Sequence, residues 1–489
     1  MLKRRIALVM ALMLLCVSMS SCKKTTTGDG SKENEIEVTF SFWEPGVKKD
    51  VENSLAKISK EYEKEHPNVK IKLLSQPVSG YQEWIKAQIV ADNLPDIESN
   101  YGPNLIEQYK GNYIVDISKD LSSPNKYNGN EIWKDTFIDG KLELAHEYKY
   151  KDKFAIPLFG TGLAVYYNKT MYDELGLKVP KTWEEFMSNC SKIEKSKKTP
   201  IAFMSQKEAA VIWMSWELTG GLLAQKLFGD PNINYNGDCN ISEREVIKSI
   251  KTGYMDFANN KDFQDMFKIY IEKYKEFLKY APDASGLDEA AAKTMFLSGQ
   301  AGHIHTGSWD IQGLLKSDEV NFEVGTFEFP TFTKTDSPYA GKGMNVSSVQ
   351  PLAITSNVNK VKGKKEAAVD FLKYLTSKDV YSGFIEATSQ IPVIKDVKVD
   401  SVFKEFMKDG YSPINLFQLG SDKEGETFKN VVNSIIVGED VKLNNELFAK
   451  IQKSLVRYAD DEIAKGAITP ENDYKISELP EIGGKFKAE

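Results

Sequence analysis

The chain has 489 residues, of which 41% are hydrophobic, 11% aromatic and 27% charged. This composition is typical of folded proteins and excludes a chain that is disordered throughout. The 63 basic and 70 acidic side chains give a net charge of −7. Because nucleic-acid backbones select basic surfaces, we expect no nucleic-acid partner. Four cysteines are too few for a disulfide scaffold. These numbers predict a folded, acidic protein that works in water.

The first 21 residues have the pattern of an export signal. The basic residues Lys3 to Arg5 precede an uncharged apolar run from Ile6 to Val17, and small residues follow it. As a helix, this run rises only about 18 Å, which is less than the roughly 30 Å of a hydrocarbon core. A shortened membrane anchor is the alternative interpretation.

Residues 19–22 (MSSC) resemble a bacterial lipobox, with Met19 in the place of the usual Leu. The resemblance implies that residues 1–21 are removed as a lipoprotein signal peptide and that the Cys22 thiol is diacylated. Two acyl chains anchor a protein stably to a bilayer. Residues 22–35 contain no large apolar side chain and are predicted to form a flexible tether. We therefore expect a body at the extracellular face of the bacterial cytoplasmic membrane.

The segment after the tether alternates strand and helix patterns. We predict strands at 35–43 and 69–74, helices at 48–65 and 81–91, and a short strand after Leu94-Pro-Asp-Ile97. This order predicts α/β layers around a largely parallel sheet, with a ligand beyond the carboxyl ends of the strands. Five residues are predicted at that edge: Trp43, Glu44, Ser99, Asn100 and Tyr101.

The remaining chain is more helical and shows no internal repeat. Strands are predicted at 155–158 and 163–167, on either side of the turn Gly160-Thr161-Gly162, and at 301–305 and 349–354. Helices are predicted at 183–197, 208–226, 242–258, 262–280, 290–297, 364–376, 402–408 and 444–464.

Residues 166–186 (YYNKTMYDELGLKVPKTWEEF) resemble the signature of bacterial extracellular solute-binding proteins, family 1. These are sugar-binding lipoproteins of ABC importers and are similar to maltodextrin-binding protein. Further matches follow in order between about residues 36 and 395: Phe42-Trp43, Leu94-Pro-Asp96, 295–302 with Gly307-Ser-Trp309, 365–376 and 390–393. The last hundred residues match only by their helical character.

The resemblance implies an α/β fold of the type II periplasmic-binding-protein kind, with a ligand cleft between two lobes that close by a hinge motion. We expect the first lobe at 36–145 plus 300–365, and a more helical second lobe at 146–299 plus 366–489. It further implies a monomer without a cofactor, which binds carbohydrate and delivers it to an ABC transporter permease. The sequence has no phosphate-binding loop, so the ATPase is expected to be another chain.

A sugar site needs aromatic rings against the C–H faces of the sugar and polar side chains for its hydroxyls. The predicted ligand-binding residues are Trp43, Glu44, Tyr101, Thr161, Trp309 and Asp310. Trp309 is the first candidate, because its family counterpart commonly stacks on sugar. The alternatives stay open: any of the aromatic residues can be core, the carboxylates can be only solvated, and the glycines beside Thr161 can serve a hinge.

Four other patterns have competing interpretations. Residues 232–243 have the spacing of a calcium-binding EF-hand loop, but Asn236-Gly237 also predicts a hairpin turn. His303 and His305 lie on one strand face, and two imidazoles without a third ligand do not make a zinc site. Trp213 and Trp216 form a core stripe or line the cleft. Cys190 and Cys239 can form a disulfide or remain small buried residues.

The sequence therefore predicts a receptor that binds a carbohydrate, in particular an oligosaccharide, without changing it. The alternatives are a lipid-anchored hydrolase or lyase acting on polysaccharide and a receptor for another polar solute. Carboxylate pairs cannot identify a glycosidase in a chain with 70 acidic residues. Neither H-E-x-x-H nor G-x-S-x-G occurs. We expect no enzyme activity.

Overall fold

The structure is a computed structural model, and the residues that it describes carry two hydrophobic cores along one long sheet. The described residues are 35–43, 49–100, 104–105, 108–109, 111–145, 153–235, 241, 243–281, 286–315, 317, 320–341, 345–398, 403, 406, 410–411, 416–421 and 427–464. The signal peptide, Cys22, the tether up to residue 34, Glu44 and Tyr101 lie outside them.

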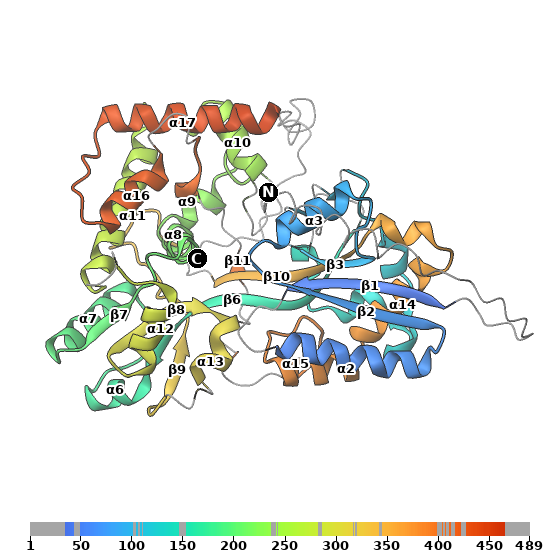
Figure 1. The fold of residues 1–489 in the computed structure, drawn as a ribbon. Helices are drawn as coiled ribbons and strands as arrows, with labels where there is room; N and C mark the ends of the chain where they lie inside the picture. The colour runs from blue at the N-terminus through green and yellow to red at the C-terminus, as the bar shows by residue number, and fades with distance from the viewer. Residues whose placement is uncertain are drawn as a thin grey trace, which may run out of the picture.

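The first part of the chain confirms the predicted alternation of strands and helices (Figure 1). Its elements are β1 (Ile36–Trp43), α2 (Asp50–Glu65), β2 (Val69–Gln76), α3 (Tyr81–Val90), β3 (Ile97–Ser99), α5 (Ser118–Leu121), β4 (Pro124–Asn125), η1 (Lys126–Asn128), β5 (Glu131–Ile132), η2 (Trp133–Thr136) and η3 (Glu143–Ala145). In α2, the apolar residues at helical spacing, Val51, Leu55, Ile58 and Tyr62, are all buried against the sheet side of the lobe.

The middle of the chain is mainly helical (Figure 1). Its elements are β6 (Ile156–Asn168), α6 (Lys169–Glu174), α7 (Trp183–Lys195), β7 (Thr199–Ala202), α8 (Glu208–Leu222), α9 (Ala224–Gly229), α10 (Glu243–Lys251), α11 (Lys261–Lys279), α12 (Glu289–Leu297), β8 (Ala301–Gly307), η4 (Ser308–Asp310), α13 (Ile311–Leu315) and β9 (Val324–Phe327). Thr182 caps α7 in a capping box with Glu185, so this helix begins where the motif T-W-E-E predicts.

The last part returns to the first core and then leaves it again. Its elements are β10 (Asn345–Ile354), η5 (Ser356–Lys360), α14 (Lys364–Leu375), α15 (Lys378–Thr388), β11 (Gly410–Tyr411), η7 (Leu416–Gln418), α16 (Phe428–Ile436) and α17 (Asn445–Ala464). Of the predicted helix at 402–408, only Phe403 and Phe406 are described. No helix within the described part of the chain is both long and apolar enough to cross a membrane.

The main sheet has the strand order β2-β1-β3-β10-β6-β8-β7, with β11 beside β10 and β9 beside β6. Parallel pairs β1–β2, β1–β3 and β7–β8 lie toward its two ends, and β10 runs antiparallel to both β3 and β6. The prediction of two strands around a turn at Gly160-Thr161-Gly162 is wrong, because these residues lie inside the single strand β6. The β6 register with β10 and β8 keeps this segment extended.

The two hydrophobic cores show which segments pack together. One core includes β1, α2, β6 up to Phe159, α14 and α15; the other includes the rest of β6, the helices α7 to α12, and α16 and α17. The predicted lobe boundaries stay a prediction, and core membership departs from them in two places. Residues 301–332 pack in the second core, and residues 367–394 pack mainly in the first. Figure 1 shows these two bodies joined by β6 and β10.

Candidate functional site

The strands β6 and β10 run side by side between the two cores, and Thr161 lies within their paired segment. In β10, Ser348 pairs with Thr161 and Val349 with Gly160. The Gly160 N–H donates to the carbonyl of Ile391 over 2.7 Å, and a Cβ at residue 160 would lie only 3.0 Å from Ile391 Cγ2. A larger residue at this position would therefore need the Ile391 side chain to shift by a few tenths of an ångström. Thr161 is partly buried.

Trp309 lies in the short helix η4, directly after β8. Gly307 pairs with Leu163 of β6, and Ser308 Oγ accepts from the Gly162 N–H at 3.4 Å. These contacts connect η4 to the segment of β6 that carries Thr161. The Trp309 indole lies over Gly307 so closely that a Cβ at residue 307 would overlap the ring. The glycine thus makes room for the indole.

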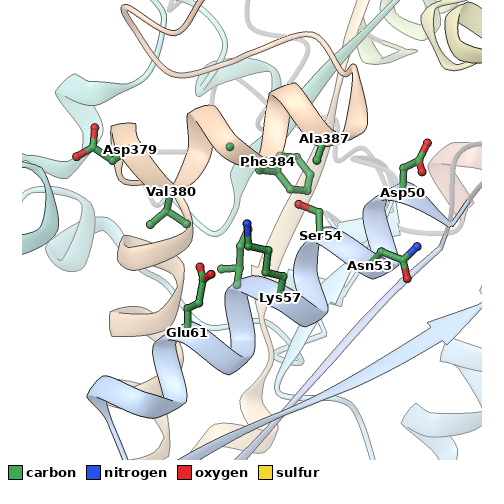
Figure 2. Close-up of a pocket in the computed structure, with 11 residues that line it drawn as sticks. Asp50, Asn53, Ser54, Lys57, Glu61, Asp379, Val380, Phe384 and Ala387 are labelled. Carbon is green, nitrogen blue, oxygen red and sulfur yellow. The ribbon is translucent and has the colours of Figure 1, made fainter.

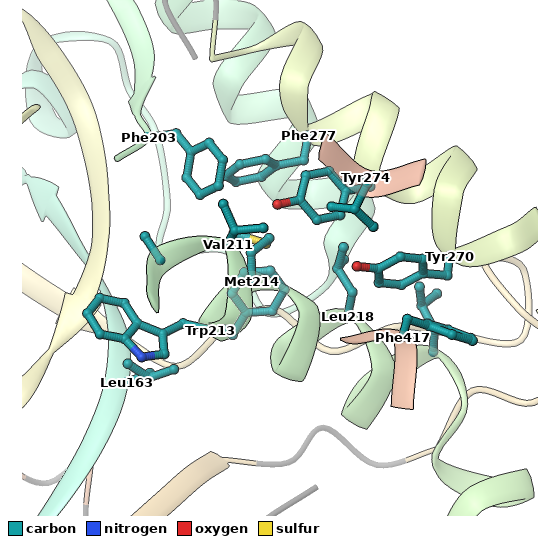
Figure 3. Packing of buried hydrophobic residues seen from close by; sticks show 14 of the residues in the cluster. Leu163, Phe203, Val211, Trp213, Met214, Leu218, Tyr270, Tyr274, Phe277 and Phe417 are labelled. Carbon is teal, nitrogen blue, oxygen red and sulfur yellow. The ribbon is translucent and has the colours of Figure 1, made fainter. Parts of the chain in front are cut away.

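The Trp309 indole contacts the indole of Trp213, which lies on α8. Its ring centroid lies 5.0 Å from that of Trp309, with the ring planes inclined by 57°. Figure 3 shows Met214 and Leu218 of α8 facing the aromatic side chains of α11, whereas Trp213 points away from them. The Lys207 ammonium lies 5.0 Å from the Trp213 ring centroid. Trp213 is thus both part of the core edge and half of an aromatic pair.

Asp310 belongs to an alternating chain of charges around this aromatic pair. Its Oδ2 accepts from the Thr306 hydroxyl at 2.6 Å, and its Oδ1 lies 2.7 Å from Lys293 Nζ. Glu289 joins Lys293, at 2.7 Å, to Lys207, at 2.6 Å. Two cations and two carboxylates balance one another. Nearby Asp310 and Glu289 raise the pKa of Lys293 against the opposing effect of its burial.

In the first lobe, Trp43 ends β1 and is 6% exposed. Its ring meets Tyr81 edge-on, with centroids 4.9 Å apart, in a small cluster with Ile85 and Leu94. Of the other residues predicted at this edge, Ser99 and Asn100 are described and Glu44 and Tyr101 are not. The structure therefore joins Trp309 and Asp310 with Thr161 through η4 and β6, and places Trp43 in a separate aromatic cluster.

A buried polar cluster lies at the carboxyl end of β3, beside Tyr81. The Asn100 amide donates to Glu98 Oε1 at 3.2 Å, and Asn100 Oδ1 accepts from Gln82 at 2.6 Å. Tyr81 shares a hydrogen bond of 2.8 Å with Ser41 Oγ. Burial raises the pKa of Glu98 to about 7, although the amides of Asn100 and Gln108 favour its ionised form.

The two strand histidines are buried and do not form a metal site. His303 Nδ1 donates to the Pro200 carbonyl at 2.8 Å, and its Nε2 accepts from the Tyr172 hydroxyl at 2.6 Å. His305 Nε2 lies 3.3 Å from the buried Glu217 carboxylate. No group of three or more metal-ligating side chains occurs among the residues that the structure describes. Half of the EF-hand-like segment, residues 236–240 and 242, falls outside them, and this half includes Cys239; Cys190 is a buried free thiol.

Two surface cavities lie elsewhere. A groove of about 370 Å³ separates α2 from α15, and Figure 2 shows Lys57 and Glu61 of α2 in it opposite Val380 of α15. A second cavity, of about 460 Å³, is lined by residues near the ends of α6, α7 and α12, among them Thr170, Ser298 and Phe322. Neither contains a predicted ligand-binding residue, and neither offers a pair of indoles.

Sequence reasoning missed three features of the site region: the cations Lys207 and Lys293 and the buried Glu98. Helical spacing identifies Trp213 but not its contact with Trp309, which lies 96 positions later in the chain. A signal for Glu98 does exist, because a carboxylate stands between the apolar Ile97 and the end of a short buried strand. Buried carboxylates without a paired cation are rare.

The structure has two α/β lobes, and two strands of one mixed sheet, β6 and β10, run between them. This is the arrangement of the two-lobed solute-binding proteins. A chitin oligosaccharide binding protein has the same fold, with a TM-score of 0.63 at 19% identity over 87% of this chain and 99% of that chain. The solute-binding protein RafE, solved with raffinose, has a TM-score of 0.58 at 20% identity over 87% of this chain and all of its own.

Sequence comparison gives the family. The family described as bacterial extracellular solute-binding protein matches residues 57–408, and the chain belongs to it. The multiple sugar-binding protein of Streptococcus mutans is 26% identical over 406 residues, which cover 81% of this chain and 84% of that protein. The resemblance found in the motifs and the predicted two-lobed α/β fold are thereby confirmed.

Proposed function

We propose that this protein is the solute receptor of an ABC importer and captures a carbohydrate, in particular an oligosaccharide, without changing it. The observation that carries the proposal is the pair of indoles, Trp213 and Trp309, beside the strands that join the lobes. Aromatic side chains combine a large apolar face with little conformational freedom, which suits the C–H face of a sugar ring.

The charges around this pair support a neutral ligand. Lys207, Glu289, Lys293 and Asp310 neutralise one another, so the region offers hydrogen-bonding groups without excess charge. A carboxylate engaged by two donors still has lone pairs for a hydroxyl, and a sugar rim presents hydroxyls in series. In this proposal Trp309 stacks on the sugar, Asp310 and Thr161 bind hydroxyls, and Trp43, Glu44 and Tyr101 complete the site from the first lobe.

The names of related proteins point the same way. The Streptococcus mutans protein is named for binding multiple sugars, and the two structural neighbours are named for chitin oligosaccharide and for raffinose. Their different ligands support the carbohydrate class and leave the sugar of this chain to experiment. Since all are binding proteins, they also favour a receptor over a hydrolase or lyase.

Capture is coupled to delivery by closure of the lobes. A ligand that contacts both lobes stabilises the closed form more than the open form, and only that difference shifts the equilibrium. The strands β6 and β10, which cross between the cores, are the proposed hinge. The closed, loaded receptor then docks as a monomer on the permease, and no cofactor takes part.

The receptor is proposed to be held at the membrane by lipid on Cys22, after removal of residues 1–21. The motif MSSC and the polar segment up to residue 35 support this anchor. Replacing Cys22 with Ser is expected to move the protein from the membrane fraction to the medium in a Gram-positive host. Retention of the Cys22→Ser variant in the membrane would contradict lipidation.

The experiment for the function is thermal unfolding of the purified protein with raffinose, stachyose, chitin oligosaccharides and malto-oligosaccharides. A ligand at a hundred times its dissociation constant stabilises the fold by about 2.7 kcal/mol. We expect a rise in melting temperature with one sugar class and unchanged sugar on chromatography afterwards. Cleavage products would establish an enzyme, and no shift with any sugar would turn the search to peptides and other polar solutes.

A further inference from the structure

Glu98 is a carboxylate in an unusual place. It lies on an interior strand of the main sheet, between Ser41 of β1 and Ala353 of β10, and has no exposed surface. The Asn100 amide donates to its Oε1, while its Oε2 has no hydrogen-bond partner. Burying a carboxylate in this state costs folding free energy, and a neutral or apolar side chain would fit a strand better. A functional role would account for its presence.

The groups packed around Glu98 are mostly uncharged. The helix α3 contributes Tyr81, whose pKa is raised by burial and by the nearby Glu98, and the segment at 108 contributes Gln108. The other ionisable side chains of α3, Glu83 and Lys86, are exposed. On β1 the ionisable residue is Glu37, at the opposite end, and β10 carries none.

One further carboxylate precedes Glu98 on the same strand segment. Asp96 is already paired with Lys364, at 3.1 Å, and accepts from Thr39 and Asn357. The charge of Asp96 is therefore balanced by Lys364. Glu98 is then the carboxyl group whose protonation changes the charge of the cluster at the end of β3.

Asn100 connects Glu98 to the predicted ligand edge. Its N–H donates to the Pro351 carbonyl at 3.3 Å, and its Oδ1 accepts from Gln82 and Asn104. Next to it, Gln350 of β10 donates to Ser99 Oγ at 2.5 Å. Asn100 thus joins β3, α3 and β10 directly after the last residue of β3.

We infer that Glu98 is a positioning residue of the sugar site: its ionised carboxylate holds Asn100 in place, and its protonation releases Asn100 and weakens sugar binding. The inference rests on the proposed function and deepens it. A hydrogen bond to an ionised carboxylate is about twice as strong as one to a neutral acid, so the Asn100 amide is held best by the charged form.

The expected size follows from the ionised fraction. With a pKa of about 7, roughly one molecule in ten carries the charge at pH 6, and the apparent affinity falls in proportion to the competent fraction. We expect raffinose, or chitin trisaccharide if that is the better ligand, to bind about tenfold more weakly at pH 6 than at pH 8. By reciprocity, sugar binding at pH 7 releases about half a proton.

The test compares the wild type with Glu98→Gln, which keeps the shape and removes the titration, and with the exposed control Glu83→Gln. Calorimetry at pH 7 in two buffers of different ionisation enthalpy counts the protons. Proton release by the wild type and Glu83→Gln, but not by Glu98→Gln, is the expected result. Proton uptake, or the same pH profile in all three proteins, would overturn the inference.

A second arm needs no sugar. Hydrogen exchange of peptides covering residues 94–109, corrected for intrinsic rates, is expected to lose protection between pH 8 and pH 6 in the wild type and to stay constant in Glu98→Gln. Equal behaviour of the two proteins would overturn the role of Glu98. Failure of every sugar to bind, with the exchange difference present, would instead overturn the proposed function and leave the hold of Glu98 on Asn100 standing.

Discussion

The indoles of Trp213 and Trp309 meet at 5.0 Å between ring centroids and at an angle of 57°. One lies on α8 and the other on η4, so the contact joins two different elements of the second lobe. A tilted pair of this kind adds roughly 0.5–1.5 kcal/mol beyond the burial of its surface. The contact favours one arrangement of the two rings before any ligand arrives, and such preorganisation lowers the entropy cost of binding.

Truncation of Trp309 tests whether this pair binds sugar. We expect Trp309→Ala to weaken sugar binding by at least about tenfold, because the truncation removes both the stacking contact and the apolar area that the indole buries against the sugar, together more than about 1.4 kcal/mol. Trp309→Phe should retain part of the affinity. Calorimetric titration measures both, with Trp183→Phe as a control for loss of a buried indole elsewhere. Unchanged affinity in Trp309→Ala would remove this residue from the site.

Gly307 offers a way to move the indole without removing it. A Cβ at residue 307 would overlap the Trp309 ring, whereas a Cβ at Gly313, on α13, would meet open space. We expect Gly307→Ala to displace the indole and weaken sugar binding as strongly as Trp309→Ala. Gly313→Ala should bind normally and melt at the same or a slightly higher temperature. Equal affinities of Gly307→Ala and Gly313→Ala for the sugar would show that the position of the indole does not matter.

Asp310 also contributes to the stability of the fold, and this contribution can be measured separately from ligand binding. Asp310→Asn leaves Lys293 with Glu289 alone and weakens the bond from Thr306. We expect a loss of about 1–2 kcal/mol in the free energy of unfolding, measured in urea. A double-mutant cycle with Lys293→Met should recover most of this loss as coupling. A coupling near zero would mean that the ion pair contributes nothing to stability.

His303 makes the fold sensitive to acid. Burial lowers its pKa to about 4, below the value of about 6.5 in an unfolded chain. The unfolded state therefore binds more protons, so stability is complete above about pH 6.5 and falls as the pH drops toward 4, by up to about 3 kcal/mol. His303→Gln should flatten the melting temperature between pH 6.5 and 4. A wild-type profile unchanged by the substitution would contradict a neutral buried imidazole.

Glu98 acts on stability with the opposite sign. Its raised pKa contributes stability that is present below about pH 4.5 and is lost as the pH rises through about 7. The two contributions overlap between pH 4.5 and 6.5 and partly cancel in the wild type. For this reason each is measured as the difference between wild type and its own variant, Glu98→Gln or His303→Gln.

The sequence predicts local structure well wherever the residue pattern of a segment is enough to determine its secondary structure. The helix α2 begins within two residues of the predicted start, and its four apolar residues at helical spacing are buried, because periodicity alone determines which face is apolar. The prediction around Gly160 failed for the opposite reason. Two glycines suggest a turn, but hydrogen bonds to β10, β8 and Ile391 keep β6 extended.

The site region could be predicted only in part, for the same physical reason. Trp309 and Asp310 stand in a motif that resembles the family, and the structure places both in the short helix that follows β8, beside the segment of β6 that carries Thr161. The partners that hold them, Trp213 and Lys293, come from other helices and are fixed by tertiary packing. Glu98 illustrates the limit most clearly, since its environment combines β1, β3, β10 and α3.

The most direct test of the account is the stoichiometry and fate of one sugar. The sugar that gives the largest thermal shift is titrated into the protein by calorimetry, and the mixture is then analysed by mass spectrometry. The account predicts one binding site per chain, a sugar recovered intact after prolonged incubation, and loss of the binding heat in Trp309→Ala. Saccharide breakdown, or binding that persists undiminished without the Trp309 indole, would contradict it.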